Sequence, residues 1–222
     1  MLDEPMESGI SSEDIALAKE NARHFDPRVR AKAIGFLAKN GPCSWDDLRS
    51  WALDAEGEIR LQALYSIGSG MDAASYLCES DKAKCSGILA AAAERYADLQ
   101  VGITMCKLAE RDAEWLDLTW QIADQLVEHG SEDQRSAMMF GFLERLIPER
   151  DWGPDDTHIR SWILSGGVQK KLLLLKIAAF RGLETGRMKE IVEEIARDRD
   201  PYIGSLAQGV LEGRVTHSDI PG

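Results

Sequence analysis

Residues 26–37 read DPRVRAKAIGFL, and this stretch decides the fold because altered copies of it return twice along the chain. Residues 56–67, EGEIRLQALYSI, keep the β-branched residue, the arginine and the alanine in the same places. Residues 200–211, DPYIGSLAQGVL, repeat the opening Asp-Pro and the apolar spacing. Self-similarity of this kind is typical of an array of stacked helix pairs.

The first copy carries its own start and stop signals. Asp26 can cap a helix whose first residue is Pro27, because the carboxylate accepts a free backbone N–H and the proline has none to leave unpaired. The apolar residues from Val29 to Leu37 fall on one stripe of that helix, which must be buried. Gly41 predicts a left-handed C-terminal stop.

Further helix pairs are expected along the chain, with second helices that begin near residues 27, 57, 98, 132, 168 and 201. Ser11 and Ser44 each precede an aspartate by three residues, which predicts capping boxes at two first helices. The third pair is irregular, and we expect an insertion or a break around residues 80–86. No useful length of sequence alternates with period two, so the predicted class is all-α.

The size and ends of the chain predict one domain. At 222 residues the chain can bury a core without disulfides or metals. We expect a single domain of about six helix pairs over residues 11–213. A flexible acidic leader is expected over residues 1–10 and a flexible tail over residues 214–222.

The charge balance bears on partners and location. The chain has 38 acidic and 26 basic residues and a formal charge of −12, which disfavours attraction to nucleic acid or an anionic membrane and favours a basic partner. It contains no leader or apolar run that predicts export or membrane anchoring. Four sparse cysteines are interpreted as reduced thiols that fill the core of a cytoplasmic protein, Cys43, Cys78, Cys85 and Cys106.

The pattern of an Asp or Asp-Pro turn, a Val or Ile, an Arg, and an Ala three residues after the Arg resembles the HEAT (armadillo-type) repeat, in the short variety of bacterial HEAT-like proteins. Asp54 and Arg60 match the positions that in this family tie neighbouring repeats together. The match is good for the first, second and sixth pairs and weak for the third to fifth. The arginine is displaced or replaced in the fourth and sixth pairs, as at Gly204. The resemblance implies a right-handed α-α superhelix, a HEAT-like solenoid.

No catalytic constellation is recognisable in the sequence. The four histidines are isolated, and neither a phosphate-binding loop nor a nucleophile motif is present. Acidic, Trp and His residues gather only at residues 149–158, which could bind a cation or hold a general base but would more commonly form a solvated capping loop. We therefore predict a protein without catalytic residues, metal or cofactor, that is, not an enzyme.

An acidic stripe is expected on the helix over residues 113–129, because its polar residues recur at steps of three and four. The stripe is either a solvated outer face or a docking ridge for a basic partner. The acids of this ridge are Glu114, Asp117, Asp124 and Glu128.

Cations gather instead in the second helices. In HEAT-like arrays these helices line the concave groove. A groove that is basic at both ends suits an acidic protein segment or a phosphate backbone. Arg30 is set aside as structural. The cations assigned to the groove are Arg28, Lys32, Lys39, Lys170 and Lys171.

These observations favour a soluble adaptor that binds another protein, or a neutralising inhibitor such as an immunity protein against a basic toxin. The alternatives are a nucleic-acid binder related to the HEAT-like alkylpurine DNA glycosylases, whose catalytic Trp, Asp and Arg cannot be placed here, and a HEAT-repeat lyase of the bilin-lyase kind. The six tryptophans are interpreted as core packing. Monomer and homodimer both stay open.

Overall fold

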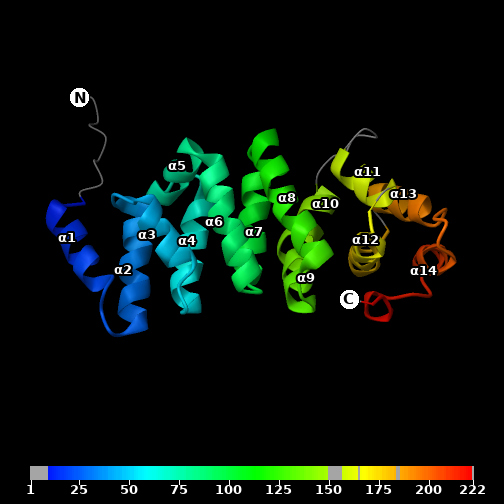
Figure 1. Cartoon of the computed structure of the whole chain (residues 1–222), viewed down its shortest axis with the longest axis horizontal. Helices are drawn as coiled ribbons and strands as arrows, with labels where there is room; N and C mark the ends of the chain where they lie inside the picture. The colour runs from blue at the N-terminus through cyan, green and yellow to red at the C-terminus, as the bar shows by residue number, and fades with distance from the viewer. Residues whose placement is uncertain (1–9, 150–156, 165, 184–185, 222) are drawn as a thin grey trace, which may run out of the picture. The chain divides into compact units, whose positions relative to one another are not determined.

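The computed structural model describes residues 10–149, 157–164, 166–183 and 186–221 (Figure 1). All regular structure in these residues is helical, which confirms the predicted all-α class. Residue contacts divide the chain into two compact units, Met1–Ala91 and Ala92–Gly222, and the division falls inside helix α6 (Lys82–Arg95). The single domain expected over residues 11–213 stays a prediction.

The described part of the first unit contains five helices and most of α6. Helix α2 packs against α1, α4 and α5, and α4 also packs against α3. Large apolar side chains of these helices are fully or almost fully buried, among them Ile34, Leu48, Ile59 and Leu64. The helices are α1 (Ser12–Asn21), α2 (Pro27–Asn40), α3 (Trp45–Ala52), α4 (Gly57–Ser69) and α5 (Ala73–Ser80).

The second unit contains the remaining helices. Helix α7 packs against α8 and the π-helical segment η1, and α12 packs against α8, α11, α13 and α14. The helices are α7 (Leu99–Ala109), α8 (Ala113–His129), α9 (Glu132–Met138), η1 (Met139–Leu143), α10 (Glu144–Glu149), α11 (Thr157–Leu164), α12 (Val168–Arg181), α13 (Gly186–Ile195), α14 (Pro201–Leu211) and the 3-10 turn η2 (His217–Asp219).

The predicted helix starts are confirmed. The six second helices begin within one residue of the predicted positions. Asp26 accepts the backbone N–H of Arg28 at 2.9 Å, and Asp200 accepts that of Tyr202 at the same distance. Both predicted capping boxes form, at Ser11 and at Ser44.

The predicted left-handed stop at Gly41 is wrong. Gly41 has φ −103° and ψ 172°, which is extended backbone. The next residue is Pro42, and the proline ring disfavours helical conformations in the residue before it and pushes that residue into the extended region. The stop after α4 does use a left-handed glycine, Gly70, with φ 83°.

An arginine four residues after the N-cap performs the same task in three helices. In α2, α4 and α9 its guanidinium donates to a backbone carbonyl of the turn before the helix, where regular helical hydrogen bonds do not reach. The arginine expected to be displaced in the fourth pair is therefore in the equivalent place. The bonds run from Arg30 to His24 and Phe25, from Arg60 to Asp54 and Ala55, and from Arg135 to Gly130, over 2.7–3.0 Å.

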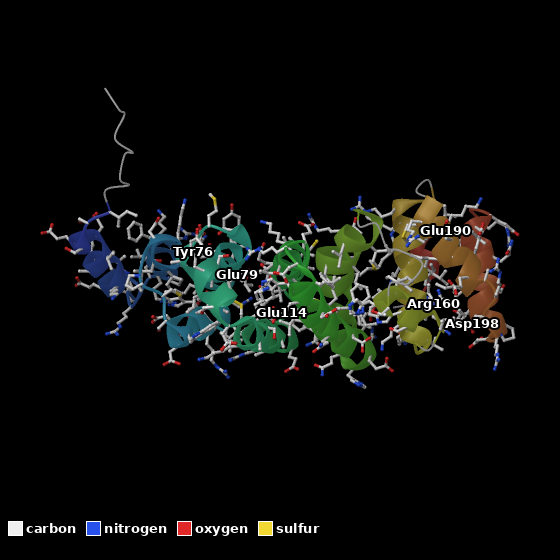
Figure 2. All side chains as sticks on the ribbon, turned by 90° about the horizontal axis from the view of Figure 1, so that it is seen from above. Tyr76, Glu79, Glu114, Arg160, Glu190 and Asp198 are labelled. Atoms are coloured by element: carbon white, nitrogen blue, oxygen red, sulfur yellow. A yellow bond between two sulfur atoms is a disulfide. The ribbon has the colours of Figure 1, made fainter. Side chains whose placement is uncertain are left out.

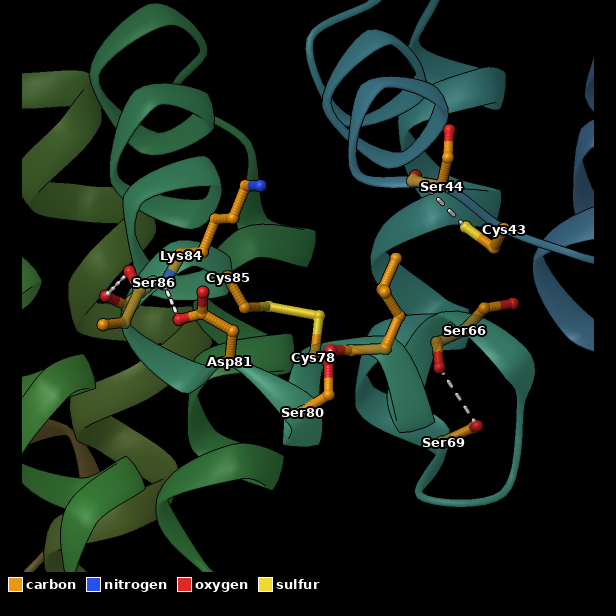
Figure 3. The surroundings of a disulfide bond; sticks show 12 residues. Cys43, Ser44, Ser66, Ser69, Cys78, Ser80, Asp81, Lys84, Cys85 and Ser86 are labelled. Carbon is orange, nitrogen blue, oxygen red and sulfur yellow. Dashed lines mark hydrogen bonds between the residues drawn. A yellow bond between two sulfur atoms is a disulfide. The ribbon is translucent and has the colours of Figure 1, made fainter.

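The predicted break in the third pair is confirmed at Asp81. Helix α5 ends at Ser80 and α6 begins at Lys82, so a single residue forms the corner. The Asp81 carboxylate accepts the backbone N–H of Lys84 at 2.9 Å and so caps α6 (Figure 3).

The interpretation of all four cysteines as reduced thiols is wrong for two of them. Cys78 and Cys85 lie on either side of the Asp81 corner, with Cα atoms 5.2 Å apart, and their sulfurs are bonded (Figure 3). Helix α5 turns back into α6 at that corner, which brings together two residues seven apart in sequence. Cys43 and Cys106 are free thiols.

The expected flexible tail is also wrong for residues 214–221. The backbone N–H groups of Arg214 and Val215 both donate to the carbonyl of Gly209, and Ile220 is only 2% exposed. Thr216 and Asp219 form a capping box around η2. Residues 1–9 of the expected leader lie outside the described residues.

In the second unit, the backbones of α7 and η1 approach each other closely. The second helix expected to begin near residue 132 contains the π-helical turn η1 (Met139–Leu143). A Cβ atom on Gly102 would lie 2.9 Å from the Cα of Gly141, and one on Gly141 would lie 2.7 Å from the carbonyl oxygen of Leu99. Only glycine lets α7 and η1 approach this closely.

Candidate functional site

Helix α2 presents three exposed cations on one face. Arg28, Lys32 and Lys39 follow one another at steps of four and seven residues, which keeps them within about 40° around the helix axis. All three are exposed, and their side chains form no ion pair or hydrogen bond with any residue that the structure describes. We call these three residues the α2 cation strip.

An apolar groove of about 380 Å³ runs beside this strip, between α1 and α2. Lys32 belongs to its lining, as does Asp14 on the α1 side. Leu17 of α1 is 58% exposed at the groove, although it is apolar. The groove is lined mainly by apolar side chains, Leu17, Ala18, Val29, Ala33 and Phe36.

Lys170, assigned to the groove from the sequence, is engaged within the chain. Its Nζ lies 2.8 Å from Asp124 and 3.1 Å from Glu128, both on α8, and its side chain is 13% exposed. Burial by itself would lower the pKa of Lys170, but the two carboxylates outweigh it and raise the pKa. The ammonium is therefore held charged between two acids.

Lys171 is engaged in the same way by a different carboxylate. Its Nζ lies 2.5 Å from Oδ2 of Asp198, which is in the turn between α13 and α14 (Figure 2). Oδ1 of Asp198 accepts the backbone N–H of Asp200 at 2.9 Å. Hydrogen bonds from Lys171 and from that backbone amide lower the pKa of Asp198. Lys171 stands four residues after the α12 N-cap, the place that the recurrent arginines occupy.

The acidic stripe of α8 contacts α11 and α12. Asp117 lies 2.8 Å from His158, and the indole N–H of Trp162 donates to Asp124 at 2.7 Å. Glu114 at the start of the stripe (Figure 2) also has an interaction partner. The stripe thus takes part in contacts inside the second unit, although Glu114, Asp117 and Glu128 are also exposed; the solvated face and the docking ridge both stay predictions.

Aromatic rings pack against this network. The ring centroid of Trp120 lies 5.1 Å from that of His158 and 5.1 Å from that of Trp162. Trp115, Trp120 and Trp162 are almost fully buried, and Trp51 is buried in the first unit. For these four tryptophans the predicted role in packing is confirmed.

The acidic cluster singled out at residues 149–158 cannot be placed. Its centre, residues 150–156, lies outside the described residues. Of its side chains, those of Thr157 and His158 are described, and His158 belongs to the α8 network. In the described part of the chain, no three His, Cys, Asp or Glu side chains gather as a metal site requires.

A further feature of the first unit that sequence reasoning missed is a cavity between α1, α2 and α3. Its charged lining residues are scattered from Lys19 to Asp54, so no local motif could reveal it.

Among the described helices, none combines the length and apolarity of a membrane span.

No protein-family model, curated protein or solved structure matches this chain.

Proposed function

We propose that the chain is a non-enzymatic module that binds another protein, as an adaptor or a neutralising inhibitor, and that it is built as a right-handed HEAT-like array of helix pairs. The recurrent arginines support the array, because one contact repeats at one place in three second helices. Lys171 occupies that place in α12 and reaches Asp198 of the following pair. Contacts between successive repeats hold such arrays together.

The α2 cation strip carries the proposal for the binding surface. It leaves three positive charges exposed and unpaired among the described residues, on a chain whose formal charge is −12. An acidic segment would be drawn to this strip and repelled by most of the remaining surface, which orients its approach. Apolar side chains of the same segment would enter the α1–α2 groove. The partner is therefore a protein segment that combines acidic and apolar residues.

The acidic ridge and the two groove lysines of α12 are less well supported as binding surfaces. Asp117, Asp124 and Glu128 already have partners in α11 and α12. Lys170 and Lys171 are each held by carboxylates. A phosphate backbone would thus find free cations at α2 but not at these two lysines, which weighs against the glycosylase-like alternative. A HEAT-repeat lyase has no described residues that support it.

A cytoplasmic location is also part of the proposal. The interpretation of all four cysteines as reduced thiols supported this location. The bond between Cys78 and Cys85 removes that support, because disulfides rarely persist in the cytoplasm.

A comparative pull-down tests the proposed function. The tagged chain and the variant Arg28→Glu/Lys32→Glu are each used at low salt on nuclease-treated and untreated native lysate. The control is Lys189→Glu/Arg197→Glu, which makes the same charge change on exposed residues of the second unit. We expect a protein that survives nuclease treatment, is lost with the α2 variant and is retained by the control.

Two results would contradict the proposal. Equal capture by all three proteins would remove the α2 strip from binding, and loss of all captured material after nuclease treatment would favour the nucleic-acid alternative. Reversal of Asp124 is not a suitable test of the ridge, because it would also break the bonds to Lys170 and Trp162.

A further inference from the structure

A cavity of about 840 Å³ lies between α1, α2 and α3 in the first unit. Pockets that bind small molecules measure about 300–1,000 Å³, so the cavity is large enough for a ligand. It is separate from the α1–α2 groove, since the two share no lining residue. The cavity is thus a second candidate site, and it does not depend on the proposed protein partner.

The charged residues of its lining are divided between two sides. Lys19 comes from α1, Arg23 from the turn that follows α1, and Arg30 from α2, whereas Asp47 comes from α3 and Asp54 from the turn that follows α3. Glu20 adds one negative charge on the α1 side. Three cations and three acids thus line the cavity, and their formal charges cancel.

Several of these groups are available to a ligand. The side chains of Lys19 and Arg23 are exposed and make no ion pair or hydrogen bond with a described residue. Asp47 uses Oδ2 to cap α3, and Asp54 uses Oδ1 to accept the backbone N–H of Glu56 at 2.8 Å. Each aspartate keeps its second carboxylate oxygen for another donor.

Two features of the lining are held in place. Arg30 is fixed by its bonds to the carbonyls of His24 and Phe25, so its charge is positioned before any ligand arrives. The apolar part consists of buried side chains from α2 and α3, which are Ile34, Leu37 and Trp51. This part would contact the apolar portion of a ligand.

From this arrangement we infer that the cavity binds a short zwitterionic peptide with apolar side chains. Its carboxylate would pair with Lys19 and Arg23, and its ammonium group with Asp47 and Asp54. An anion without an ammonium group would face the two aspartates unpaired, and a cation without a carboxylate would face Lys19 and Arg23. A ligand with both charges at separate ends, and no net charge, satisfies both sides.

The test uses leucyl-leucine as the probe, titrated into the full chain at low salt and followed by isothermal titration calorimetry and by amide NMR shifts. N-acetyl-leucyl-leucine, which lacks the ammonium group, and leucyl-leucinamide, which lacks the carboxylate, are titrated alongside. We expect the free dipeptide to bind at least about tenfold more tightly than either blocked form, with shifts in α1 and α3. Absence of binding up to about 10 mM, or equal affinity for the three peptides, would overturn the inference.

Two variants test which charged residues bind each end of the peptide. Arg23→Gln should weaken leucyl-leucine binding about tenfold but leave leucyl-leucinamide unchanged, because the amide has no carboxylate to lose a partner. Asp54→Asn should weaken leucyl-leucine but not the acetylated form, and the asparagine can still accept the Glu56 N–H. Lys39→Gln, outside the cavity, is the control that should change none of these affinities. If Arg23→Gln weakens all three peptides equally, the carboxylate does not bind there and the inference is wrong.

Discussion

At the scale of single residues, the same side chain has opposite roles depending on what the fold brings beside it. Lys32 and Lys170 were both assigned to one basic groove, yet Lys32 is exposed without a described partner and Lys170 is held by two carboxylates. Helical periodicity predicts the face on which a lysine lies. It cannot predict that Asp124, 46 positions earlier in the sequence, faces Lys170.

The Lys171–Asp198 pair should stabilise the chain in a pH-dependent way. Because the pKa of Asp198 is lowered in the folded state, the pair contributes fully above the ordinary pKa of 3.8 and its contribution is lost as the pH falls through the folded value. Asp198→Asn should therefore lower the free energy of unfolding by about 1 kcal/mol at neutral pH. Urea unfolding of both proteins from neutral pH downwards measures the difference.

The difference should vanish once the pH lies below the folded pKa of Asp198. The matched control is Asp133→Asn, an exposed acid in the first turn of α9. A difference that stays constant down to the lowest pH would show that the amide disturbs the turn in another way.

Cys43 should be an unreactive thiol. Burial, reinforced by the negative charge of Asp47, raises its pKa to about 12 from 9.0. The thiolate is the reactive form, so alkylation near pH 8 should be about 100-fold or more slower than in the urea-unfolded chain. Peptide mass spectrometry after timed iodoacetamide treatment measures the rate, and equal rates in the folded and unfolded chains would contradict the assigned environment.

At the scale of helices, the sequence predicts the structure correctly wherever the signal lies within a few neighbouring residues. Asp26-Pro27 and the Ser44 capping box fix helix starts through bonds that span two or three residues, and both were predicted. The errors came from contacts that local patterns do not contain. Cys78 and Cys85 meet because two helices turn back at Asp81, and Ile220 is buried although its segment reads as a polar tail.

The contact between α7 and η1 should not tolerate added atoms. Gly141→Ala would place Cβ 2.7 Å from the carbonyl oxygen of Leu99, and Gly102→Ala would place it against Gly141. Each variant should lose about 1–3 kcal/mol of stability, as overpacked positions do. Thermal or urea unfolding provides the measurement.

Gly87→Ala is the control for this prediction. Gly87 lies inside α6 with nothing within 4 Å of its added Cβ, so alanine should stabilise the chain by about 0.5–1 kcal/mol through its higher helix propensity. Stability of Gly102→Ala and Gly141→Ala equal to or above that of the native chain would mean that α7 and η1 do not approach through their backbones.

At the scale of the whole molecule, the formal charge of −12 conceals a local excess of positive charge. The sequence predicted that cations gather in second helices, and α2 retains three of them in exposed positions. The lysines of α12 instead form ion pairs with acids of α8 and of the turn before α14, within the second unit. The proposed binding surface is accordingly smaller than the one predicted, and it lies in the first unit.

The affinity of the captured partner for a variant without the α2 strip tests the central claim most directly. Isothermal titration calorimetry compares the native chain with Arg28→Gln/Lys32→Gln/Lys39→Gln at low and moderate salt, and Lys189→Gln/Arg197→Gln/Arg199→Gln is the matched control. We predict that the α2 variant binds at least about tenfold more weakly and loses most of the salt dependence, while the control binds as the native chain does. An unchanged affinity and salt dependence in the α2 variant would contradict the proposal that this strip binds the partner.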